Sequence, residues 1–128
     1  MNEKAQYWVE LADYDLETAR VMLENRRFLY VGFMCHQVAE KMLKAFYANT
    51  HSDLPPYTHN LKYLARESGI DESMSEDQGN TLNLLQPLNI EARYPEDRDK
   101  LMKTLSEERC ALLLGKTQEL YGWIKQQL

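Results

Sequence analysis

The chain has 128 residues, a formal charge of −5 at neutral pH and a pI near 5.2. This length suits one domain with a core of its own, so we expect residues 1–128 to form a single domain. The negative charge argues against binding to duplex DNA, which requires a basic face. With 44% hydrophobic residues, five glycines and four prolines, the composition favours helices over a turn-rich β-fold. We therefore expect an all-α protein.

Neither export nor a metal centre is indicated. Cys35 and Cys110 lie far apart without the spacing of a zinc site, which predicts two buried thiols in a reducing compartment. The sequence has no basic-then-apolar leader and no apolar run near the roughly 18 residues that span a bilayer. We expect a cytoplasmic protein with no metal, no cofactor and no membrane contact.

The first two predicted helices are long and amphipathic. Residues 3–25 carry an apolar stripe at helical spacing, with Asp15 near its middle. A buried carboxylate is costly unless it is paired, so Asp15 needs a partner. Residues 28–49 form a second helix with a broad apolar face. Because apolar residues also lie on its back, this helix should contact neighbours on more than one side.

A loop and a short helix follow. The double proline in HSDLPPYTHN predicts a loop over residues 51–60. Thr58 is expected to cap a short helix that begins near His59 and ends near Gly69. The short connections elsewhere favour an up-and-down bundle of four to five helices.

The C-terminal third is predicted as two helices. The first contains Leu82 and Leu85 and is bent or delimited by Pro87, and Pro95 marks the loop after it. Residues 99–127 are predicted as one long helix, because leucines recur along them at helical spacing.

Four short motifs now follow one another in order. They are Trp8-x3-Ala12-x2-Asp15-Leu16-x2-Ala19, His36-Gln37-x2-Glu40-Lys41-x2-Lys44-Ala45, Thr58-His59-x-Leu61 and Arg93-Tyr94-Pro95. In this order and at these separations, they resemble the HEPN domain family over about residues 7–95. The resemblance implies a helical bundle, frequently a homodimer, that many prokaryotes encode beside a small nucleotidyltransferase. It also implies nucleotide binding, and many members are metal-independent RNases of toxin–antitoxin and defence systems.

The motif of the family's RNases is missing here. Those enzymes carry an arginine and, after four to six residues, a histidine on the same helix face. There the arginine would stabilise the scissile phosphate and the histidine would act as acid or base. None of His36, His51 and His59 follows an arginine at this spacing, and the nearest arginine before His36 is Arg27, nine residues upstream. The sequence therefore disfavours RNase activity of the usual kind.

The second helix carries polar residues in i,i+4 pairs. Glu40 and Lys44 are expected on an exposed face, where such a pair stabilises a helix by only ~0.2–0.5 kcal/mol. Gln37 and Lys41 lie on the flank of the apolar stripe. From there the Lys41 ammonium could reach Asp15 or an anionic ligand.

His36 lies on the other flank, where a hydrogen-bonded core or interface histidine is commoner than a catalytic one. Together with Asp15, Gln37 and Glu40, it is predicted to form a structural polar network.

The candidate nucleotide-binding residues are Lys41, His59, Arg93 and Tyr94. His59 is expected in the first turn of its helix, a place that suits an anion. Arg93 could clamp a phosphate and Tyr94 could stack on a base. Equally, Arg93 could pair with a carboxylate of the first two helices.

Three functions stay open at this point. A binding module would dimerise and take up a nucleotide, RNA or a nucleotidyltransferase partner without chemistry of its own. A metal-independent endoribonuclease would lose activity in His36→Ala or Arg93→Ala. A purely structural homodimer would hold its polar residues in a closed hydrogen-bond network. The sequence favours the binding module.

Overall fold

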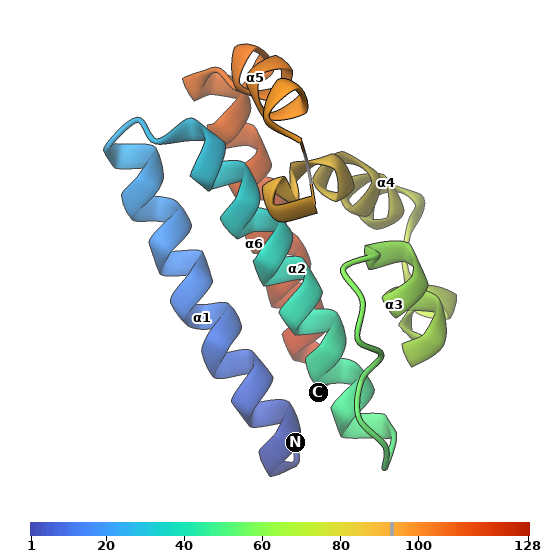
Figure 1. Ribbon diagram of the computed structural model, residues 1–128. Helices are drawn as coiled ribbons and strands as arrows, with labels where there is room; N and C mark the ends of the chain where they lie inside the picture. Colours follow the sequence, from blue (N-terminus) through green and yellow to red (C-terminus); the bar gives the residue numbers. More distant parts are fainter. Residues whose placement is uncertain (93) are drawn as a thin grey trace.

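Two long antiparallel helices frame the bundle in the computed structural model, which describes residues 1–92 and 94–128 (Figure 1). α1 spans Glu3–Glu24 and α2 spans Phe28–Thr50. Both helices match their predicted ranges to within one residue. Uninterrupted apolar periodicity is the most readable signal in a sequence, and it runs the full length of both helices.

α2 is the central helix. It packs against α1 on one side and against α6 (Glu107–Gln126), while α3 (Leu61–Ser68) and α4 (Glu76–Leu85) lie on the side away from α1 (Figure 1). The predicted contacts of this helix on more than one side are confirmed. Large apolar side chains from α2, α3, α4 and α6 are fully buried in one core: Met42, Leu43, Leu61, Leu64, Leu82, Leu85, Leu113 and Ile124.

The loop before α3 ends differently from the prediction. Asn60, rather than Thr58, caps α3, because its side-chain oxygen accepts from the Tyr63 amide at 3.0 Å. His59 consequently lies just outside the helix instead of in its first turn. Gly69 ends α3 with a φ of +86°, as glycine does readily.

Short 3-10 turns complete this layer. η1 spans Ile70–Ser73, and η2 (Gln86–Leu88) and η3 (Ile90–Ala92) follow α4. Pro87 lies in η2, so it delimits α4 as predicted.

The expected single C-terminal helix is wrong, because two helices occupy this region. α5 spans Pro95–Thr104, and α6 begins after a break at Leu105 and Ser106. Ser106 caps α6 by accepting from the Arg109 amide at 3.1 Å, while Leu105 is buried in the core. Pro95 begins α5 rather than lying in a loop, because the first helical position needs no backbone N–H donor. None of the described helices is both long and apolar enough to cross a membrane.

Candidate functional site

A row of polar side chains on α2 is buried, contrary to the prediction for Glu40 and Lys44. His36, Glu40 and Lys44 follow one another at one-turn intervals and are 0%, 4% and 8% exposed. The expected exposed face is wrong because the loop before α3 covers this side of α2. At the Lys44 end of the row, the ammonium lies over the Trp8 ring of α1, 5.4 Å from the ring centre.

Glu40 is the centre of this cluster. One carboxylate oxygen accepts from His59 Nδ1 at 2.7 Å, and the other accepts from the Lys44 ammonium at 3.1 Å. A carboxylate only accepts, so the Nδ1 atom of His59 carries the proton. Glu40 thereby ties α2 to the loop before α3 and compensates a buried cation.

His36 is held as a neutral imidazole. Its Nε2 atom donates to the His59 carbonyl at 3.1 Å. Its Nδ1 atom lies 4.0 Å from a Glu40 oxygen and has no hydrogen-bond partner among the described residues. Burial lowers the pKa of His36 below its ordinary value, an effect that the nearby Glu40 carboxylate opposes.

Gln86 fastens the same loop from the other side, and the sequence analysis missed it. Its side-chain N–H donates to the His59 carbonyl at 3.1 Å, and its side-chain oxygen accepts from the Leu61 amide at 2.7 Å. An amide ahead of a proline carries no sequence signal for such a contact. The backbone of His59 is therefore fixed by two side chains, one from α2 and one from η2.

A second polar tie joins α1 to α2. The Lys41 ammonium donates to the Asp15 carboxylate, and both side chains are largely buried. Lys41 is thus engaged with Asp15, one of the two partners that the sequence allowed. Gln37 lies on the same helix, and its side-chain oxygen is buried without a partner in the described part of the chain.

A pocket of about 570 Å³, lined mainly by polar residues, opens beside His59. Three segments that are distant in sequence line it, at the start of α3, at η2 and in the first turn of α5: Thr58, His59, Asn60, Gln86, Pro87, Asn89 and Asp97. Among the residues that the structure describes, this lining contains an imidazole, a hydroxyl, amides and one carboxylate, but no lysine or arginine.

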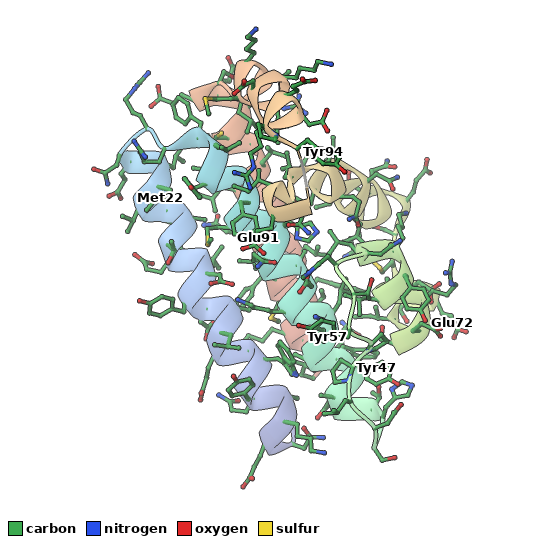
Figure 2. The ribbon with its side chains drawn as sticks, in the orientation of Figure 1. Met22, Tyr47, Tyr57, Glu72, Glu91 and Tyr94 are labelled. Atoms are coloured by element: carbon green, nitrogen blue, oxygen red, sulfur yellow. The ribbon has the colours of Figure 1, made fainter. Side chains whose placement is uncertain are left out.

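Tyr94 lies just before α5, the helix whose Asp97 lines the pocket. It is the residue before Pro95, its ring is largely exposed (Figure 2), and its carbonyl accepts from the Asp97 amide at 3.0 Å. Arg93, the other candidate of that motif, lies outside the described residues. Within residues 1–92 and 94–128, no group of three histidine, cysteine or acidic side chains could hold a metal ion.

Comparison with known proteins identifies the family. The family model described as the HEPN domain matches residues 5–127. The crystal structure of TT1696 from Thermus thermophilus is similar in fold, with a TM-score of 0.84 and 20% sequence identity over 99% of this chain and 100% of that one. A search of curated proteins finds no match. The motif order predicted this family, and since the family model covers nearly the whole sequence, the chain belongs to the HEPN domain family.

Proposed function

We propose that this chain is a non-catalytic HEPN module that binds a nucleotide in the pocket beside His59. It binds the nucleotide, a small nucleotidyltransferase partner or both, as the HEPN half of a toxin–antitoxin-type pair. The observation that supports this proposal is the convergence of three segments on one pocket lined mainly by polar residues. The exposed Tyr94 precedes α5, the helix that supplies Asp97 to this lining. The polar network on α2 by itself would suit a purely structural dimer equally well.

The chemistry of the pocket suits the nucleoside end of the ligand. Amides and a hydroxyl can pair with the edges of a base, and the Asp97 carboxylate can accept hydrogen bonds from ribose hydroxyls. With Nδ1 of His59 donating to Glu40, its Nε2 atom is an acceptor in the neutral ring and a donor in the protonated ring. The exposed Tyr94 ring offers a surface for stacking. Arg93 remains our candidate for the phosphate.

The proposed module catalyses no cleavage of RNA. A general acid or base must reach the substrate, but His36 has no exposed surface and its pKa is lowered by burial. The His59 ring donates to Glu40, and no arginine precedes His59 in the sequence at the spacing that the RNases use. We therefore expect purified protein to leave RNA intact. Cleavage in the presence of a chelator that is lost in His36→Ala would favour the endoribonuclease instead.

The test is a calorimetric titration of the purified protein with AMP. We expect Tyr94→Ala to weaken binding about tenfold, because stacking on one aromatic ring contributes ~1–3 kcal/mol. Asp97→Asn should also weaken binding, because it replaces the carboxylate that accepts from the ribose hydroxyls. Tyr57→Ala is the matched control, since Tyr57 is a fully exposed tyrosine outside the pocket. Undetectable binding, or equal losses in all three variants, would leave the structural dimer as the better explanation.

The partner and the homodimer are tested separately. A nucleotidyltransferase reading frame beside the gene, and co-purification of its product with this chain, would support the partner. Sedimentation of the chain alone reports whether two copies pair.

A further inference from the structure

The outer face of α1 carries a mostly apolar stripe, three of whose five residues are exposed. Tyr7, Leu11, Tyr14, Thr18 and Val21 follow one another at alternating spacings of four and three residues, and we call them the α1 stripe. Tyr7, Tyr14 and Val21 are 59%, 76% and 41% exposed. At 100° per residue these three lie within about 40° of one another around the helix. A spacing of this kind is the one with which a helix packs against a second helix.

The inward face of α1 shows that the stripe is not part of the core. The buried residues of α1 are Ala5, Val9, Ala12, Leu16 and Ala19, which lie on the opposite side of the helix. Asp13 accepts from the Tyr121 hydroxyl of α6 and Asp15 pairs with Lys41 of α2, so the two edges of α1 are fixed by its neighbours. α1 lies at the rim of the bundle (Figure 1), and the stripe lies between these edges on the helix face opposite the buried residues.

The stripe continues into an apolar hollow at the start of α1. This hollow of about 380 Å³ is lined by apolar side chains of α1, α2 and the loop after it, Tyr7, Trp8, Ala48, Leu54 and Pro55, with Glu3 and Lys4 at its edge. Leu54 is largely exposed there, and the Tyr7 and Trp8 rings meet edge to face at 5.8 Å. A large apolar side chain of a partner could fill the hollow while a helix lies along the stripe.

A row of glutamates runs along one side of the stripe. Glu3, Glu10, Glu17 and Glu24 recur every seventh residue, and all four are exposed. They lie on the edge that faces α6. Glu17 pairs with Arg20 at 3.0 Å, and Glu10 accepts from the neutral Gln6 amide at 3.2 Å. One cation thus offsets one of the four carboxylates, and the row stays predominantly anionic. A partner must therefore bring positive charge to this flank.

A second copy of the chain does not supply that charge. In an antiparallel pair of α1 helices related by a twofold axis, the same edges meet, so each glutamate row would face the other. In a parallel pair, the row would face the opposite edge, where Lys4 is the one cation that α1 contributes and Asp15 is already paired with Lys41. Like charges at such spacing are repulsive.

We propose that the α1 stripe is the docking site for an amphipathic helix of a partner protein, with apolar residues at heptad spacing and lysine or arginine along one flank. From Tyr7 to Val21 the stripe is about 21 Å long, which a partner helix matches with about four turns. This site is separate from the nucleotide pocket and does not depend on the proposed function.

The test uses two synthetic helical peptides of about four turns. Both carry leucine at the heptad positions, and the flanking positions carry lysine in one and glutamate in the other. Fluorescence anisotropy follows binding to the full chain, at concentrations where each peptide alone is monomeric. We expect saturable binding of the lysine peptide and much weaker binding of the glutamate peptide.

Variants tie the binding to the stripe. Tyr14→Ser should weaken the lysine peptide about tenfold or more, as expected for a tyrosine at the centre of an interface. Met102→Ser, which removes an exposed apolar side chain of α5, should leave the affinity unchanged. Replacing both Glu10 and Glu17 by lysine should reverse the preference between the peptides. Circular dichroism confirms that each variant is folded.

Three outcomes would overturn the proposal. The first is no saturable binding of the lysine peptide, and the second is equal affinity for the two peptides. The third is a dimer of the chain that Tyr14→Ser converts to monomers, because a second copy would then occupy the stripe.

Discussion

Replacing Glu40 with alanine should destabilise the fold by about 3 kcal/mol, because it leaves a buried cation without its carboxylate. The Lys44 side chain is only 10% exposed and its ammonium lies 3.1 Å from Glu40. Removing one member of a buried ion pair costs about 3–5 kcal/mol. The Trp8 ring keeps one favourable contact with Lys44, which places the expected loss at the lower end of this range. His59 adds little, because half of its side chain is exposed and water can replace the lost bond.

Urea unfolding with linear extrapolation measures this loss. Glu17→Ala is the matched control, since Glu17 forms an exposed pair with Arg20 on α1 and should change stability by no more than about 0.5 kcal/mol. A double variant, Glu40→Ala with Lys44→Met, should recover much of the stability because it removes the unpaired charge as well. A loss below about 1 kcal/mol in Glu40→Ala, or no recovery in the double variant, would refute the reasoning.

Further predictions follow from burial and pairing. The pKa of His36 in the folded chain lies below its ordinary value of 6.5. As the pH falls below 6.5, the unfolded chain therefore takes up a proton on this histidine before the folded chain does. The contribution of neutral His36 to the free energy of unfolding should therefore decrease as the pH falls below about 6.5. In His36→Gln, the free energy of unfolding measured with urea should depend less on pH. Burial raises the pKa of Cys35 and of Cys110 to about 11, so a thiol reagent at neutral pH should label them only after the protein unfolds. Asp15→Asn should lower the free energy of unfolding by about 1–2 kcal/mol, because it weakens a largely buried tie to Lys41, and thermal unfolding checks this.

Local signals made part of the fold predictable. The periodic stripes of α1 and α2 and the double proline after them are properties of short sequence windows. The break between α5 and α6 also had local signals, because Ser106 is followed by Glu107 and Glu108 in the first turn of α6. The leucines on both sides of this break continued the helical spacing and hid the boundary.

The polar cluster was less predictable because it depends on contacts between distant segments. A lysine and a glutamate one turn apart on α2 have the same sequence pattern whether water or a loop covers them. Only the course of the loop before α3, which brings His59 against Glu40 across 19 positions, decides between these cases. The role of Gln86 depends on the same loop, so no local pattern could indicate it.

The tautomer of His59 tests the tie between α2 and this loop most directly. A long-range ¹⁵N–¹H NMR spectrum of the histidine side chains identifies which ring nitrogen carries the proton. We predict that Nδ1 of His59 is protonated at neutral pH in the wild-type chain, and that this preference is lost in Glu40→Ala. A His59 ring protonated at Nε2 alone, or a spectrum that Glu40→Ala leaves unchanged, would contradict the buried network that we describe.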